Sequence, residues 1–301
     1  SKYKNRGNHI ITTPLEHSSV LETCKYLESK GFIIDYVKIK DNGLIDIEDL
    51  ERLLTDNTIL VSVAYVDSEL GIRQDIDTIS KIVKKHPKCY FHVDATQAIG
   101  KIKVDPTSID FISMSAHKIF GLKGIGLLIK KDNIVIDNLI HGGKSTTIYR
   151  SGTPALPLIC SLMKALELVI PNIDKNYEYV SSPSRKIGEI SQKKIKDNLK
   201  KYDNIHINST ENSIPYIINF SVIGVKPETF IHTMEEEDIY LSTKSACSTS
   251  DVSLSVDSIY HNREISMSSI RISLSYKNTE EEIDKFIKAF DKIYNKLVFK
   301  K

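Results

Sequence analysis

Polar side chains that could do chemistry follow three short apolar runs. Asp94 and Gln97 follow one run, His117 and Lys118 follow another, and His17 follows a third. Taken alone, Asp94 is better explained as a strand end or a helix N-cap. A lysine that lies beside a histidine and a glycine-rich stretch, downstream of an aspartate, has the features of a Schiff-base amine.

A second reactive group is the thiol of Cys247. It lies in the run Leu-Ser-Thr-Lys-Ser-Ala-Cys-Ser-Thr-Ser-Asp at residues 241–251. Small polar residues on both sides predict an exposed loop, and Lys244 is a candidate basic neighbour for a nucleophilic thiolate. The other cysteines have apolar neighbours and are interpreted as buried hydrophobic side chains: Cys24, Cys89 and Cys160.

The first two-thirds of the chain alternate apolar runs with helical patterns, which predicts an α/β fold with a mainly parallel sheet and flanking helices. Strands are expected at residues 9–13, 32–38, 58–66, 89–94, 110–115 and 124–130, and helices from Ser19 and at residues 46–54 and 77–85. Ligands of such sheets bind beyond the carboxyl ends of the strands, where the three polar clusters lie.

The pattern changes after residue 170. A long polar helix is expected at residues 177–199, strands at 205–207, 216–222 and 268–275, and helices at 227–237 and from Thr279. We therefore predict a large domain at residues 1–170 and a smaller C-terminal α+β domain at residues 171–301, which carries the Cys247 loop.

Composition narrows the function classes. The chain has 301 residues, 27% of them charged, and a formal net charge of +2, so no global field favours nucleic acid or a membrane surface. No apolar run approaches the roughly 18 residues that a membrane span needs, and residues 193–201 are interpreted as a solvated helix face. Four widely spaced cysteines without metal-ligand spacing predict a cytoplasmic protein with free thiols and no metal.

Six motifs in register resemble the cysteine desulfurases of the class V aminotransferase superfamily, which have the pyridoxal 5'-phosphate (PLP) fold type I. They are Glu16-His17, His92-Val93-Asp94-Ala95-Thr96-Gln97, Ser115-Ala116-His117-Lys118, Arg150-Ser151-Gly152-Thr153, Ser245-Ala246-Cys247 and Ser269-Ile270-Arg271. The lysine motif together with the cysteine motif is the specific part of the resemblance.

The resemblance implies a role for each residue around PLP. Lys118 would bind the cofactor covalently and move protons, and Asp94 would pair with the pyridinium nitrogen. His17 would stack on the ring, and Gln97 would donate to the phenolic oxygen. Ser68 stands where the family usually has an asparagine, and its shorter side chain would reach that oxygen through a water.

The remaining roles concern the phosphate and the substrate. Ser115 and His117 would bind the phosphate, joined by Thr153 of a second subunit, which implies a homodimer. Arg271 would bind the carboxylate of L-cysteine with two parallel donors. Cys247 would take the sulfur as a persulfide, release alanine, and pass sulfur to an acceptor such as an iron–sulfur scaffold, a tRNA-thiolation protein or a free thiol.

Two alternatives stay open. A different class V enzyme, such as a selenocysteine lyase or an aminotransferase, would share Asp94, Gln97 and Lys118 without using Cys247. The chain also begins after the N-terminal segment that helps to bind the phosphate in this family, so we expect weak PLP retention. An inactive, truncated relative is therefore the third hypothesis.

Overall fold

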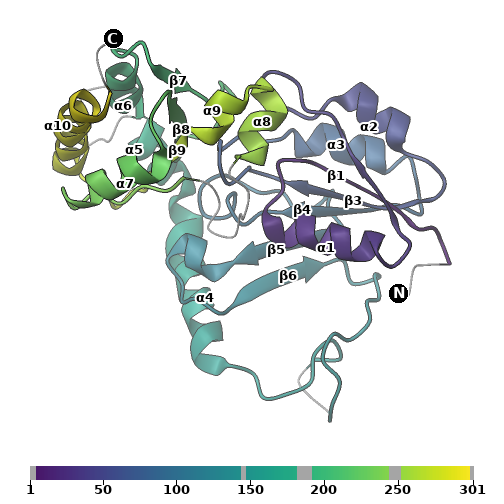
Figure 1. The fold of residues 1–301 in the computed structure, drawn as a ribbon. Coiled ribbons are helices and arrows are strands. Elements are labelled where there is room, and N and C mark those ends of the chain that lie inside the picture. The colour runs from purple at the N-terminus through teal and green to yellow at the C-terminus, as the bar shows by residue number, and fades with distance from the viewer. Residues whose placement is uncertain (1–4, 144–146, 182–191, 244–251, 299–301) are drawn as a thin grey trace.

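The computed structural model describes residues 5–143, 147–181, 192–243 and 252–298. Its larger sheet has the strand order β2-β1-β3-β4-β5-β6 (Figure 1). The strands are β1 (His9–Thr12), β2 (Ile33–Tyr36), β3 (Thr58–Ala64), β4 (Tyr90–Asp94), β5 (Phe111–Ser115) and β6 (Gly126–Lys130). All neighbouring pairs are parallel except β5 with β6, which confirms the expected mainly parallel sheet.

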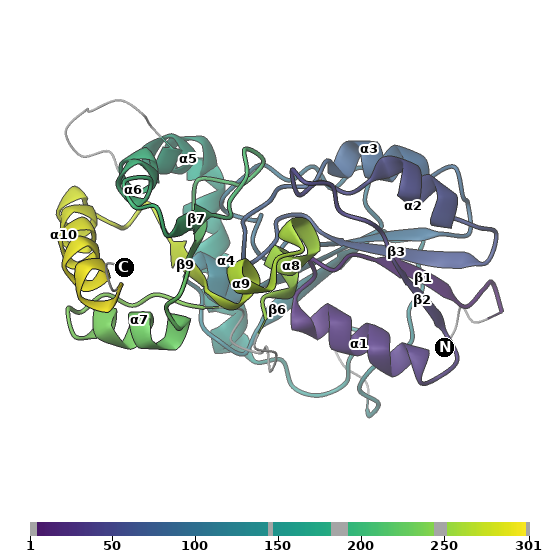
Figure 2. The same cartoon turned by 45° about the horizontal axis from the view of Figure 1, so that its top comes forward.

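Strand β3 forms because its side chains are mainly apolar on both faces, with Leu60 and Ala64 on the face opposite Val61 and Val63. Val61 and Val63 on β3, and Phe91 and Val93 on β4, are almost completely buried. Such strands need helices on both sides of the sheet. Helix α1 (Ser18–Glu28) covers one face, while α2 (Ile47–Leu53) and α3 (Ile76–Val83) cover the opposite face (Figure 2).

A second, antiparallel sheet follows in the C-terminal part. It consists of β7 (Ile205–Ile207), β8 (Ile217–Val222) and β9 (Ser269–Ser273) in that order. The helices α5 (Ile173–Ser181), α6 (Gln192–Leu199), α7 (Pro227–Glu235) and α10 (Glu280–Leu297) surround it. The helix expected from Thr279 is confirmed, and it starts with a capping box, because the Thr279 and Glu282 side chains each accept the backbone N–H of the other.

Several elements differ from the sequence expectations. The expected single helix at residues 177–199 is wrong, because α5 already begins at Ile173, and α6 is a separate element in the described chain. The expectations also missed α4 (Leu156–Val169), α8 (Leu254–Tyr260), α9 (Arg263–Met267) and the 3-10 helices η1 (Ala116–Ile119) and η2 (Ile170–Asn172). All but α4 are shorter than two full turns, so they show too little periodicity to recognise.

Helix α4 begins a long apolar stretch and corrects one further expectation. Residues 156–181 are the one helical stretch among the described residues that is long and apolar enough to cross a membrane by length and composition alone. Lys164, Glu167 and Pro171 interrupt the apolar pattern of this stretch, which is why the sequence showed no such run. Cys160 is exposed rather than buried, since it lies on the outer side of α4, whereas Cys24 and Cys89 are buried as expected.

The two sheets share one apolar core. Phe91 on the first sheet and Phe220 on the second belong to the same cluster of buried side chains. A smaller cluster joins Leu70 and Ile72 to Val256 and Ile259 on α8, so the segment after the Cys247 loop packs on the N-terminal half of the chain. The domain boundary near residue 170 stays a prediction.

Candidate active site

The carboxyl ends of β3, β4 and β5 meet at one edge of the sheet. Ala64 pairs with Asp94, and Asp94 pairs with Ser113, so the polar residues that follow these strands converge. They line a pocket of about 350 Å³, which we call the cofactor pocket. Its lining includes most of the predicted site residues: His17, Ser68, Asp94, Gln97, Ser115, His117, Lys118 and Arg271.

Lys118 enters this pocket from η1, directly after β5. The short helix ends at Phe120, whose φ of 67° is in the left-handed region. Ser115 is the N-cap residue of η1, but its hydroxyl does not hydrogen-bond to the backbone of that helix. The pKa of the His117 imidazole is lowered by burial and then by the charges of Lys118 and Lys123.

The imidazole of His17 caps α1. Its Nδ1 accepts the backbone N–H of Ser19 at 3.2 Å and lies 2.9 Å from the Ser19 hydroxyl. The expectation that this helix starts at Ser19 is therefore wrong: the helix begins at Ser18 and His17 is its N-cap. Because Nδ1 is engaged, the ring of His17 has a fixed position at the wall of the cofactor pocket.

Glu16, directly before it, is a buried carboxyl group. Its Oε1 accepts the Ala64 N–H at 2.7 Å and the Thr13 hydroxyl at 2.9 Å, whereas its Oε2 has no partner among the described residues. Burial raises the pKa of Glu16 to about 8, and the charges of Asp94 and Asp67 act in the same direction. Glu16 is therefore protonated at neutral pH, next to the cofactor pocket.

The turn at residues 67–69 connects the cofactor pocket to α8. Asp67 accepts the Ser255 hydroxyl at 3.0 Å, and Glu69 accepts the Ser253 hydroxyl at 2.5 Å. Burial raises the pKa of Asp67 to about 6, and the charge of Glu69 adds to the effect. Ser68, between the two acids, lines the pocket.

Arg271 comes from β9 of the second sheet and reaches the same turn. Its Nη1 donates to the Ser68 carbonyl at 2.7 Å, while its buried Nε has no partner among the described residues. Burial lowers the pKa of Arg271, and the carboxylates of Glu69 and Asp67 oppose this change. The guanidinium thus has donor capacity left for an anion in the pocket.

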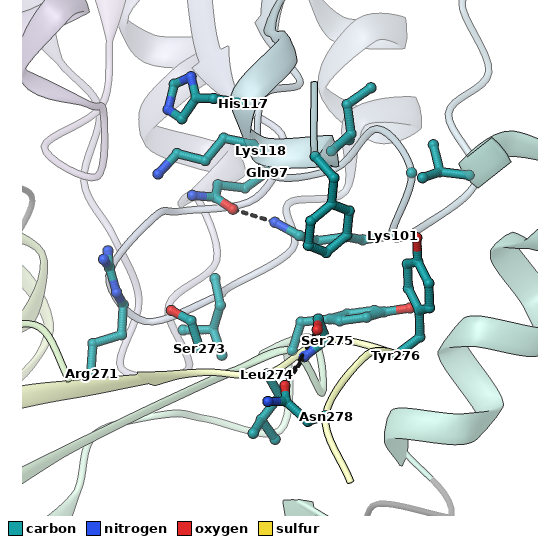
Figure 3. Close-up of a pocket in the computed structure, with 16 residues that line it drawn as sticks. Gln97, Lys101, His117, Lys118, Arg271, Ser273, Leu274, Ser275, Tyr276 and Asn278 are labelled. Carbon is teal, nitrogen blue, oxygen red and sulfur yellow. Dashed lines mark hydrogen bonds between the residues drawn. The ribbon is translucent and has the colours of Figure 1, made fainter. Parts of the chain in front are cut away.

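A second pocket of about 360 Å³ adjoins the first and lies between the two sheets (Figure 3). Gln97, His117, Lys118 and Arg271 line both pockets. The second pocket adds Lys101, whose Nζ donates to Oε1 of Gln97. Sequence reasoning missed Lys101, although its position four residues after Gln97 could have drawn attention to it.

Comparisons with known proteins agree on one family over most of the chain. The family model for aminotransferase class V matches residues 1–286. Cysteine desulfurase IscS of Clostridium botulinum (strain Hall) is 37% identical over 297 residues, which is 96% of this chain and 73% of that protein. Cysteine desulfurase IscS of Buchnera aphidicola subsp. Baizongia pistaciae is 38% identical, over 98% of this chain and 72% of that protein.

Solved structures agree with the sequences. A NifS-like protein superposes with a TM-score of 0.88 at 33% identity, over 98% of this chain and 77% of that one. A NifS-like protein from Rickettsia africae gives a TM-score of 0.84 at 30% identity, over 97% and 76% of the two chains. This chain belongs to the cysteine desulfurases of the class V aminotransferase family. These relatives support a desulfurase and give no support to the selenocysteine lyase or aminotransferase considered above.

Cysteine desulfurases use PLP, and the cofactor pocket has the chemistry that PLP requires. An amine, an acid and hydroxyl and imidazole donors line one cavity: Lys118, Asp94, Ser115 and His117. The cavity volume lies in the range typical of small-molecule sites. Because the unpartnered Nε of Arg271 adds a buried donor to this lining, the residues present fit the cofactor and an anionic substrate.

The structure does not bring two of the predicted site residues into view at the pocket. Thr153 is exposed and lines neither of the two pockets. Cys247 lies outside the described residues, as does Lys244. The roles of both Thr153 and Cys247 therefore stay predictions.

Proposed function

We propose that this desulfurase holds PLP on Lys118 and transfers the sulfur of L-cysteine to Cys247. The observation that carries the proposal is the convergence of Lys118, Asp94 and Arg271 on one cavity, although they come from different strands. The position of Arg271 places a carboxylate receptor on the same cavity as the amine.

The described flanks of the Cys247 loop support its part in the reaction. Ser242 and Arg271 exchange backbone hydrogen bonds of 3.2 and 2.6 Å, and Ser253 bonds to Glu69 beside the cofactor pocket. Cys247 is five residues from Ser242, so an extended chain lets it reach about 17 Å from that point. Both ends of the loop are therefore fixed close enough for the thiol to approach the substrate.

In the proposed reaction, bound PLP supplies an electron sink for negative charge on the substrate carbon. Asp94 would keep a proton at the ring nitrogen, Gln97 would donate to the phenolic oxygen, and Ser68 would reach that oxygen through a water. Arg271 orients the substrate through its carboxylate, and the amine of Lys118 takes and returns protons on the substrate carbon. His17, at the wall of the cofactor pocket, would pack against the ring.

The sulfur step needs no outside oxidant. The Cys247 thiolate attacks the sulfur of bound L-cysteine, an S–S bond forms, and the substrate C–S bond breaks with its electron pair passing to the carbon fragment. That fragment takes up a proton and leaves as L-alanine. Enzyme thiol and L-cysteine thus give enzyme persulfide and L-alanine, and we propose that an iron–sulfur scaffold or a tRNA-thiolation protein then accepts the sulfur.

We also propose a cytoplasmic homodimer. The described cysteines are free thiols, as expected of a reducing compartment. Thr153 is exposed rather than in its own pocket, which supports a contribution to the phosphate site of a second subunit.

Two variants test the proposed function. Cys247→Ser should retain PLP, seen as a borohydride-sensitive visible absorbance, and should lose sulfide release from L-cysteine by at least about 100-fold because the attacking thiolate is gone. Lys118→Ala should lose the borohydride-sensitive absorbance itself. Cys160→Ser, at an exposed cysteine outside both pockets, is the matched control and should release sulfide like the wild type. Unchanged sulfide release in Cys247→Ser would exclude the proposal.

A further inference from the structure

Lys101 lies at the wall of the second pocket, in the turn that follows β4. Gly100 has a φ of +78°, and a Cβ there would be 2.9 Å from side-chain atoms of Ile119 and Val169. The backbone at this point therefore lies directly against its neighbours, which only glycine permits. This close approach carries Lys101 into the space between the two sheets (Figure 3).

The charge of Lys101 has no carboxylate partner among the described residues. Its charged neighbours are cations: burial, together with the charges of Lys118 and Arg271, lowers the pKa of Lys101 to about 7. The amide oxygen of Gln97 is its one hydrogen-bond acceptor in the part of the chain that the structure describes. An amine kept next to two other cations is costly, and such perturbed groups cluster at functional sites.

The two ends of the Gln97 amide are chemically different. In the structure Nζ of Lys101 donates to Oε1 of Gln97, and below the pKa of Lys101 the ammonium can only donate, so the NH₂ group of Gln97 faces away from it. Figure 3 shows the oxygen of Gln97 turned to Lys101 and its nitrogen on the side of Lys118. No described residue accepts a hydrogen bond from this NH₂ group, and Gln97 also lines the cofactor pocket. The pairing thus selects one of two amide orientations, the one that presents a donor to that pocket.

We propose that Lys101 is a positioning residue, which fixes the Gln97 amide so that its NH₂ group donates to the phenolic oxygen of PLP. With the opposite orientation, an amide oxygen would face the negative phenolic oxygen, and two acceptors would repel each other. The inference deepens the proposed function and rests on it, because it needs PLP in the cofactor pocket.

The test uses the PLP-loaded enzyme and a spectroscopic readout. Lys101→Met keeps the length of the side chain and removes the donor. The pH midpoint of the change in the visible absorbance of bound PLP should rise by about one unit, because a donor to the phenolic oxygen is lost. Lys101→Arg, which keeps a cationic donor, should have a midpoint close to that of the wild type. Lys103→Met, at an exposed lysine two residues away that pairs with Asp174, should leave the midpoint unchanged.

A double-mutant cycle separates positioning from a direct effect of charge. If Lys101 acts through Gln97, then Lys101→Met should cause no further shift in a Gln97→Ala background. Urea unfolding of the PLP-free proteins measures a structural role separately. An equal shift with and without Gln97, no shift at all, or a loss of stability without a shift would each overturn the inference.

These outcomes are distinct from a failure of the proposed function. A wild-type enzyme without borohydride-sensitive absorbance would overturn both proposals. A wild-type enzyme with that absorbance and with Cys247-dependent sulfide release, whose Lys101→Met variant has an unchanged midpoint, would overturn the role of Lys101 alone.

Discussion

Glu16 shows how one residue at the site couples fold stability to pH. Its carboxyl group is 5% exposed and has a pKa of about 8, against 4.5 when unburied. Between these two values the folded state holds a proton that the unfolded state has lost. The stabilising contribution of protonated Glu16 is therefore complete below pH 4.5 and is lost as the pH rises towards 8.

Glu16→Gln removes this titration and keeps the acceptor for Ala64 and Thr13. From about pH 5 to about pH 7, the free energy of unfolding of the wild type should fall by about 3 kcal/mol relative to that of the variant. Urea unfolding of the PLP-free proteins at both pH values measures the difference. Glu28→Gln, at an exposed glutamate on α1, is the control. If the difference in free energy of unfolding between the wild type and Glu16→Gln did not change with pH, the raised pKa would be contradicted.

At the scale of elements, Ser253 connects α8 to the turn at residues 67–69, beside the cofactor pocket. Its hydroxyl accepts the Val256 N–H at 3.2 Å as the N-cap of α8 and donates to Glu69 at 2.5 Å. The same residue therefore starts a helix and fixes the C-terminal end of the Cys247 loop. Because Glu69 is buried, the lost bond would leave a carboxylate oxygen poorly solvated.

Ser253→Ala should accordingly lower the free energy of unfolding by about 1–3 kcal/mol. It should also slow sulfide release more than it weakens PLP binding, since the loop end is displaced while Lys118 and Asp94 are intact. Equilibrium unfolding, PLP titration and sulfide assays give the three values. Ser258→Ala, on the same helix and bonded among the described residues to the Ser255 carbonyl alone, should change sulfide release little. An equal loss of sulfide release in the two variants would contradict the specific role of Ser253.

At the scale of the whole molecule, the active site lies where the two sheets meet. The carboxyl ends of the first sheet supply the amine and the acid, and β9 of the second sheet supplies Arg271. Phe120 and Tyr276 also contact each other edge to face across this junction, with ring centroids 5.6 Å apart. Movement of one sheet relative to the other would therefore change the distance between the carboxylate receptor and Lys118.

The proposed dimer can also be tested at the scale of the whole molecule. If Thr153 completes the phosphate site of the second subunit, Thr153→Val should weaken PLP binding about tenfold, as expected for a lost hydrogen bond to a charged group. Mixed dimers of Lys118→Ala and Thr153→Val subunits should then contain one intact site and regain tight PLP binding, measured by absorbance titration. Mixtures that bind PLP no better than the separate variants, although mixed dimers form, would contradict a shared site.

The sequence by itself determined the strands of the larger sheet and most of the pocket lining. Apolar runs on both faces predicted the central strands, and polar residues after them predicted a site at their carboxyl ends, because parallel strands bring those ends together. Asp94, Gln97 and Lys118 were found in this way. The start of α10 at Thr279 could likewise be predicted from local sequence, since both partners of its capping box lie within the first turn of the helix.

Only the tertiary structure decided which distant residues meet. The bond from Arg271 to the Ser68 carbonyl joins positions 203 residues apart, and that from Ser253 to Glu69 joins positions 184 apart. The direction of the Lys101 side chain depends on the packing of Gly100 against Ile119 and Val169. Local sequence patterns do not predict such contacts, because the contacts depend on how the two sheets and their helices pack together.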